Sequence, residues 1–258
     1  MNYDISTIEN CYNTMEEMTG FQYWEDMFKI YAYHYIDEPD RMKNEVMVSK
    51  NIHIKNIELE SINFVLLHVT TSANRCKNII KEGLHDLVWS CTHDTELKQF
   101  LDNQYNKIDI ENKQININGI LYDIPNDLKQ SGGVGFKLYN DPDICGCFQI
   151  DKDCPYGGNV HQRPEILYNI GKLVKDVNLE YMWYSTHEPY IIKFKVPYND
   201  TDIFLSMSHN ENKDKILKNL FNYAFTTVFY NSFSSDKIGI LKRGKYIPAE
   251  NIISIEKY

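Results

Sequence analysis

The stretch "LLHVTTSANRCKNIIKEGL" places two polar side chains, His68 and Thr70, at the end of an apolar segment. In a β-strand alternate side chains share a face, so these two would point to the same side of a sheet. An imidazole can donate or accept a hydrogen bond, and a threonine hydroxyl can do both. Such a pair could bind a ribose or an amide. Spacing alone also allows a core histidine bonded to a nearby carbonyl, because a buried polar group needs a partner.

The elements around this pair are predicted to be a strand followed by a helix. "NFVLLHVT" is typical of a buried strand, and "SANRCKNIIKEGL" is typical of a short helix. Ser72 is expected to cap the helix N-terminus, and Gly83 fits the position just after its C-terminus. The predicted apolar face of the helix consists of Ala73, Cys76, Ile79 and Ile80.

This combination resembles the first motif of diphtheria-toxin-type ADP-ribosyltransferases. It is also similar to the motif of RNA 2′-phosphotransferases and of bacterial DNA-targeting toxins of the DarT kind. The residues that carry the resemblance are His68, Val69, Thr70, Ile79, Gly83 and Leu84. The resemblance implies that the histidine bonds the ribose of NAD and that the backbone of Val69 grips the nicotinamide amide. The Thr70 hydroxyl would support both contacts.

Two further motifs of this superfamily have partial counterparts. In "GGVGFKLYNDP" an aromatic residue, Phe136 or Tyr139, would stack on nicotinamide, and we take Tyr139 for this role. The alternative is a glycine-rich turn with packed aromatic rings. "GILKRGKYIPAENI" resembles the C-terminal motif Glu-x-Leu-x-x-x-x-Ile-Pro-x-x-x-Ile, but Gly239 stands where the catalytic glutamate is expected.

The missing glutamate leaves three interpretations open. In the family this residue polarises a ribose hydroxyl and stabilises a cationic transition state. Asp236, the nearest acid in sequence, or another acid could serve instead. The protein could also bind NAD or another nucleotide without transferring ADP-ribose. As a third interpretation, it could carry out phosphotransferase chemistry, which uses basic residues.

Two basic segments could meet phosphate. "YGGNVHQRPEIL" gathers His161, Arg163 and Glu165 at a helix start, where anions are favoured, and Arg163 could clamp a phosphate in bidentate fashion. The alternative is a capping loop with solvated charges. "DKIGILKRGKY" gathers four cations near the C-terminus and is expected to be a solvated edge hairpin, with phosphate contact as the alternative. These cations are Lys237, Lys242, Arg243 and Lys245.

The six cysteines do not predict a metal site. Cys145, Cys147, Cys154 and His161 have the spacing C-x-C-x6-C-x6-H, whereas structural zinc sites usually carry paired C-x(2–4)-C knuckles. We therefore expect free thiols and no metal. With no secretory signal and no apolar run near the roughly 18 residues that span a bilayer, the sequence predicts a cytoplasmic protein without a membrane partner.

Length and charge set the remaining limits. A chain of 258 residues can bury a full core. Its net charge of -9 disfavours nonspecific binding to nucleic acid, although a local basic patch stays open. Residues 1–55 are predicted to form a helical N-terminal part. In this part aromatic residues recur at helical spacing, and Pro39 ends one helix and opens the next.

Strands and helices without strict alternation favour an α+β fold. By resemblance, residues 56–258 would form an ADP-ribosyltransferase-like domain with a split β-sheet. The preferred function is an NAD-dependent ADP-ribosyltransferase-like toxin or phage-defence effector of bacterial or phage origin, modifying an unidentified protein or nucleic acid. An antitoxin would then be an expected partner. The alternatives are a nucleotide- or partner-binding module without turnover, or an RNA-end phosphotransferase.

Overall fold

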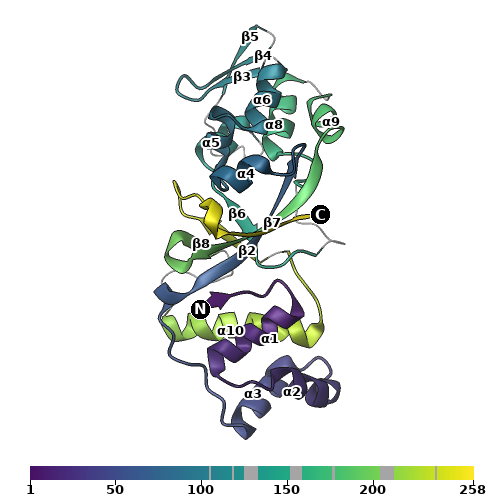
Figure 1. Cartoon of the computed structure of the whole chain (residues 1–258), viewed down its shortest axis with the longest axis vertical. Coiled ribbons are helices and arrows are strands. Elements are labelled where there is room, and N and C mark those ends of the chain that lie inside the picture. The colour runs from purple at the N-terminus through teal and green to yellow at the C-terminus, as the bar shows by residue number, and fades with distance from the viewer. Residues whose placement is uncertain are drawn as a thin grey trace. The chain divides into compact units, whose positions relative to one another are not determined.

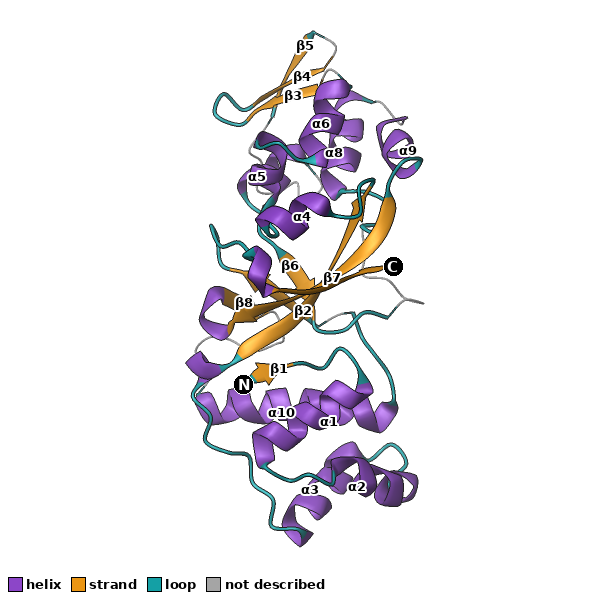
Figure 2. Ribbon diagram, in the orientation of Figure 1, coloured by secondary structure: helices purple, strands orange, loops and turns teal. Residues whose placement is uncertain are grey.

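The protein has a mixed α+β architecture (Figures 1 and 2). The computed structural model describes residues 1–104, 106–117, 119–124, 133–151, 159–175, 178–203, 212–235 and 237–258. Its α-helices are α1 (Ile8–Thr19), α2 (Trp24–Tyr31), α3 (Pro39–Ser49), α4 (Lys77–Glu82), α5 (Leu87–Thr92), α6 (Glu96–Asn103), α7 (Val134–Tyr139), α8 (Glu165–Val174), α9 (Asn178–Tyr184) and α10 (Lys213–Tyr230).

The strands form one large and one small sheet. The large sheet has the order β10-β7-β2-β6-β9-β8, with β1 paired in parallel to β2, and the small sheet has the order β3-β4-β5. The pairs β10–β7 and β2–β6 are antiparallel. The strand bounds are β1 (Asn2–Tyr3), β2 (Asn63–Ser72), β3 (Asn106–Asp109), β4 (Gln114–Ile117), β5 (Ile120–Asp123), β6 (Cys145–Cys147), β7 (Glu188–Pro197), β8 (Thr201–Ile203), β9 (Ile238–Leu241) and β10 (Ile252–Lys257).

Packing divides the chain into two compact units, each assembled from three segments. Unit 1 comprises Met1–Leu67, Gly146–Cys154 and Lys195–Ile240. Unit 2 comprises His68–Cys145, Pro155–Phe194 and Leu241–Tyr258. The division falls within β2, β6, β7 and β9, and it does not coincide with the boundary after residue 55 that the sequence suggested.

In unit 1 the N-terminal helices pack on the long helix α10. α1 lies along α10 (Figure 1), and the buried rings of Trp24 and Phe28 on α2 contact those of Phe221 and Phe225. The aromatic stripe of this segment is therefore largely a packing face. Pro39 begins α3, as predicted, because its missing N–H is not needed in the first turn of a helix. The prediction that Pro39 also ends the preceding helix is wrong, since α2 ends at Tyr31.

In unit 2 helices α5 to α9 and the small sheet share one apolar core. Trp183 of α9 is buried in it, and its indole Nε1 donates to Thr71 Oγ1 of β2 at 2.8 Å. The sequence "KIDIENKQININGILYDI" alternates and carries "NG", which is typical of a small hairpin; β4 and β5 form this hairpin, and β3 adds a third strand to it. This core holds the end of β2 in place, because Thr71 points into it from the face opposite to Thr70.

The predicted start of the helix after β2 is wrong. β2 continues to Ser72, and α4 begins only at Lys77. Ser72 Oγ accepts from the backbone N–H of Cys76 at 2.8 Å, so it stabilises a turn rather than a helix N-terminus. Arg75 and Cys76 both have left-handed backbone conformations, with φ of 62° and 57°. The predicted helix therefore cannot run through these two residues. Ile80, expected on the apolar face, is exposed.

Gly83 closes α4, as predicted, and is required by a close backbone approach. Its φ of 90° and ψ of -176° lie in a region that is essentially open only to glycine. A Cβ atom there would lie 2.1 Å from the carbonyl oxygen of Ile247. Leu84 and Ile247 form an antiparallel bridge whose two N–H···O hydrogen bonds are both 2.9 Å long.

We predict that Gly83→Ala lowers the free energy of unfolding by about 3 kcal/mol or more, because it combines backbone strain with loss of this bridge. Urea denaturation would measure the change. Gly119→Ala is the matched control, because Gly119 also has a positive φ, of 83°, but nothing lies within 4 Å of its Cβ position. It should cost only about 1–2 kcal/mol. Equal losses in the two variants would contradict the close approach.

Candidate functional site

His68 is held in one orientation at the middle of β2. Its Nδ1 lies 2.8 Å from the carbonyl oxygen of Cys145, on the neighbouring strand β6. A carbonyl can only accept, so Nδ1 donates and Nε2 carries the lone pair of the neutral ring. Nε2 has no hydrogen-bond partner among the residues that the structure describes. The half-buried imidazole can therefore accept a hydrogen bond from a ligand hydroxyl.

The neutral form of His68 is favoured by its surroundings. Burial lowers the pKa of the imidazole, and the hydrogen bond to Cys145 opposes this effect only in part. The pKa therefore lies below the ordinary value of about 6.5. At neutral pH the ring is uncharged, and Nε2 keeps its accepting role.

The strand is buried before His68, half-buried from His68 to Thr70, and buried again at Thr71 and Ser72. Phe64 to Leu67 are buried, whereas His68, Val69 and Thr70 are each half-buried. Within the described part of the chain, the Thr70 hydroxyl makes no hydrogen bond that would occupy it. His68 and Thr70 are therefore not enclosed core residues. The structure places both on one face of the partly exposed stretch of β2.

A constrained turn follows this strand end. Glu96 Oε1 accepts from the backbone N–H groups of Ala73 and Asn74 at 3.0 and 2.9 Å. These bonds hold the turn that contains left-handed Arg75 and Cys76. Left-handed non-glycine residues cost free energy and persist only where surrounding contacts determine them. The sequence analysis did not single out Glu96, because no local pattern shows that its carboxylate reaches a turn more than 20 residues earlier.

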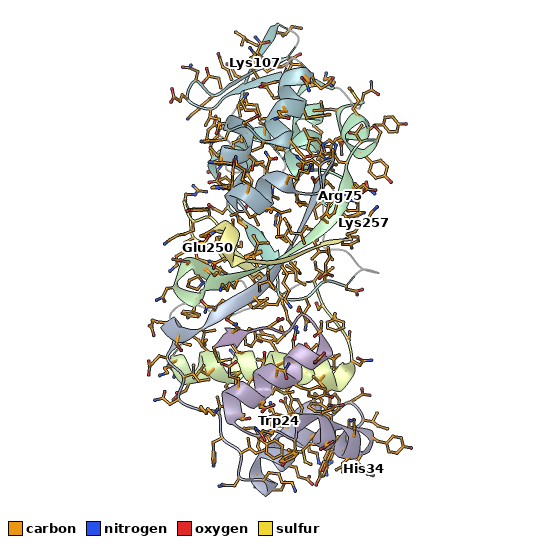
Figure 3. All side chains as sticks on the ribbon, in the orientation of Figure 1. Trp24, His34, Arg75, Lys107, Glu250 and Lys257 are labelled. Atoms are coloured by element: carbon orange, nitrogen blue, oxygen red, sulfur yellow. The ribbon has the colours of Figure 1, made fainter. Side chains whose placement is uncertain are left out.

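Arg75 is a further candidate that the sequence analysis missed. Its side chain is exposed, and its charge contributes to a lowered pKa of Glu188, whose main cause is the hydrogen bond from Lys257. The charge of Arg75 also acts on Lys257, where it opposes the rise of the pKa that Glu188 causes. Figure 3 shows Arg75 and Lys257 in the same region. Two cations therefore lie near the turn after Thr70. The sequence signal that could have pointed to this candidate is an arginine five residues after Thr70.

Tyr139, predicted to stack on nicotinamide, lies at the end of helix α7 rather than after a glycine-rich strand. Its hydroxyl donates to the carbonyl oxygen of Ile110 at 3.1 Å, and its ring packs against the core of unit 2. The ammonium of Lys113 lies 5.5 Å from the ring centroid. Lys113 thus already lies over the ring that was expected to stack on a ligand.

Arg163, predicted to meet phosphate, is buried and paired. Its Nε bonds to Glu180 Oε2, and its guanidinium lies 4.9 Å from the ring centroid of Tyr168. Glu165 from the same motif pairs with Lys137 at 2.9 Å. These contacts connect α8 to its neighbours and give the charges a structural role within unit 2.

Position 239 lacks a carboxylate and has little room for one. A Cβ atom on Gly239 would lie 3.0 Å from Leu66 Cδ1, so Leu66 fills the space in front of this position. Leu66 shares a strand face with His68 by alternation. Asp236, the proposed substitute, lies outside the described residues. Residue 239 therefore supplies no carboxylate to a ligand.

Among the described residues, no group of three or more histidine, cysteine or acidic side chains could hold a metal ion. Neither Cys145 nor Cys147 forms a disulfide with another described residue, and Cys154 lies outside the described part. No described helix combines the length and apolar character needed to cross a membrane.

Comparison with protein-family models, with curated proteins and with solved structures gives no match. The residues themselves therefore carry the functional interpretation.

The lowered pKa of His68 predicts a pH dependence of stability. The unfolded chain binds a proton near pH 6.5, whereas the folded chain binds it only at lower pH. Between these values the unfolded state holds more protons, so the free energy of unfolding should fall as the pH decreases from about 7 to 5. His187, whose pKa burial also lowers, contributes in the same direction.

Urea denaturation at several pH values would measure this dependence. His68→Gln and His187→Gln should each reduce the slope, and the double variant should reduce it most. Above about pH 8 the slopes should coincide, because histidine is then neutral in both states. An unchanged slope in His68→Gln would show that the buried environment of His68 does not perturb its titration.

Proposed function

We propose that the protein is an ADP-ribosyltransferase-like nucleotide-binding protein whose ligand is NAD. The observation that carries the proposal is the arrangement of His68. Its Nδ1 is committed to Cys145, and its free Nε2 lies on the same strand face as the Thr70 hydroxyl. A ribose hydroxyl can donate to Nε2, while Thr70 can donate or accept beside it.

One backbone contact supports the proposal. The glycine and leucine that end the first motif, Gly83 and Leu84, meet Ile247 of the segment "IPAENI" through the antiparallel bridge. The first and the C-terminal motifs of the proposed family are thereby in contact within unit 2. The exposed side chain of Arg75 supplies positive charge for a diphosphate, whereas Lys257 is paired with Glu188 at 2.6 Å.

ADP-ribose transfer requires one more group. The bond between the nicotinamide nitrogen and C1′ of the ribose breaks, nicotinamide leaves with the bonding electrons, and a nucleophile of the target attacks C1′ and loses a proton. The sugar becomes cation-like, and a carboxylate stabilises it electrostatically. Asp236 is the proposed acid. With this group in place, the protein would act as a bacterial or phage toxin or defence effector that modifies a macromolecule.

A second candidate function is nucleotide binding without turnover. Gly239 and the Leu66 side chain in front of it favour this alternative, because the position of the family's glutamate is apolar and filled. Such a protein would keep the ribose contacts of His68 and Thr70 but would lack the group that lowers the barrier.

Titration calorimetry with NAD tests the proposed site. We expect saturable binding that His68→Ala and Thr70→Val each weaken about three- to tenfold, the effect of one lost hydrogen bond. Thr92→Val, a substitution on an exposed helix residue, is the control and should bind as the unaltered protein does. Absence of NAD binding by the folded, unaltered protein would contradict the proposal.

Release of nicotinamide separates the two candidates. If the protein is a transferase, Asp236→Asn should keep NAD binding and lose most of the nicotinamide release. If NAD binds and no nicotinamide appears even with a cell lysate as target, the protein is a binding module. Unchanged release in Asp236→Asn would remove this residue from the mechanism.

A further inference from the structure

Four aromatic rings of unit 2 stack face to face in one column. The ring centroids of Tyr246 and His85 are 4.7 Å apart, those of His85 and Trp89 are 3.8 Å apart, and those of Trp89 and His93 are 4.6 Å apart. The interplanar angles are 3°, 14° and 11°, so all four planes are nearly parallel. We call this set the ring column.

Two local rules build the ring column. His85, Trp89 and His93 follow one another at intervals of four residues along and beside α5, which places them on one side of the helix. The bridge between Leu84 and Ile247 then places the next pair, His85 and Tyr246, beside each other. His85 Nε2 donates to the carbonyl oxygen of Glu82 at 2.9 Å, which fixes the plane of its ring.

The ring column is accessible to a ligand. Tyr246 is 51% exposed and His93 is exposed, while His85 and Trp89 are half-buried. The other two tryptophans, Trp24 and Trp183, are buried. His85 and Trp89 are each covered by stacked neighbours, so the outer faces of Tyr246 and His93 are the ones that a ligand can cover. Covering such a face with another flat ring is favourable. A ligand with flat heteroaromatic rings therefore suits this surface.

A cationic loop adjoins the ring column at Tyr246. The segment "KRGKY" exposes three cations and contains no acid. Arg243 anchors the loop through bonds of 3.1 and 2.9 Å to the carbonyl oxygens of Tyr139 and Asn140, and it also pairs with Asp143. Lys242 forms no ion pair with any residue in the described ranges. This local charge contrasts with the net charge of -9 of the chain.

We infer that the ring column and the KRGKY loop together form a binding surface for single-stranded nucleic acid. Unpaired bases would stack on the two outer faces of the column, those of Tyr246 and His93, and the phosphates between them would meet the cations of the loop. Aromatic platforms beside positive charge bind single strands in this way, with little dependence on sequence. In a duplex the bases are already stacked and the column cannot engage them, so the acidic chain should bind duplex weakly.

The inference stands independently of NAD binding, because none of these residues belongs to the His68 site. If the protein transfers ADP-ribose, a bound single strand would be its target class.

Fluorescence anisotropy with labelled oligothymidylate and oligouridylate of about twelve nucleotides tests the inference. We expect saturable binding at low salt that weakens as salt is added. A base stacked on the outer face of His93 lies one ring away from Trp89, and Trp24 and Trp183 are buried, so quenching of the tryptophan fluorescence on binding should come from Trp89. Trp89→Phe should keep the binding and remove the quenching.

Matched variants identify the surface. Tyr246→Ala should weaken binding about tenfold or more, because stacking of one base is lost, and Tyr246→Phe should restore it. Lys242→Glu should lower the steepness of the salt dependence by about 0.7, the contribution of one phosphate contact. The controls are Tyr181→Ala, an exposed tyrosine on α9, and Lys107→Glu on β3 (Figure 3), which should both bind normally.

Three results would overturn the inference. These are absence of saturable binding to either single strand, equal affinity of Tyr246→Ala and the unaltered protein, and equal or tighter binding of a duplex. Polyglutamate of similar length serves as a charge control. Polyglutamate binding as tight as that of the oligonucleotides would show that the surface responds to negative charge alone.

Discussion

The antiparallel bridge between Leu84 and Ile247 determines much of unit 2. It brings the end of α4 against the segment before β10, two regions far apart in the sequence. Its two hydrogen bonds require the backbone of residue 83 to pass so close to Ile247 that no side chain fits there. The same bridge places Tyr246 beside His85. A single backbone contact thus explains an essential glycine, joins the two motifs of the candidate family and completes the ring column.

The polar residues of this protein separate into those that the fold uses and those that it leaves open. Arg163, Glu165 and Tyr139 looked suitable for a ligand by type and spacing, but all three make contacts with other parts of unit 2. His68 is partly committed, since one ring nitrogen is bonded and the other is not. A half-satisfied group on a partly exposed stretch of strand is better evidence for a ligand than charge alone, because a ligand that covers the group can supply the missing hydrogen bond.

The sequence predicted the features that obey local rules. The apolar strand through His68, the glycine after α4, the start of α3 at Pro39 and the hairpin at "NG" follow from periodicity and backbone preference. The start of α4 could not be predicted, since consecutive left-handed residues at Arg75 and Cys76 are stabilised by Glu96 from another helix. Partners such as Glu180 for Arg163 depend on packing that no local pattern encodes.

The acidity of the whole chain did not exclude a local basic surface, because charge acts over about a Debye length, roughly 8–10 Å.

The central claim concerns His68, and nitrogen NMR of protein with ¹⁵N-labelled histidine tests it most directly. At neutral pH the His68 ring should show a protonated Nδ1 and an unprotonated Nε2, and saturating NAD should shift the Nε2 resonance toward the value of a hydrogen-bonded acceptor. A proton on Nε2, or an Nε2 resonance that saturating NAD leaves unchanged, would contradict the claim that His68 holds the ribose.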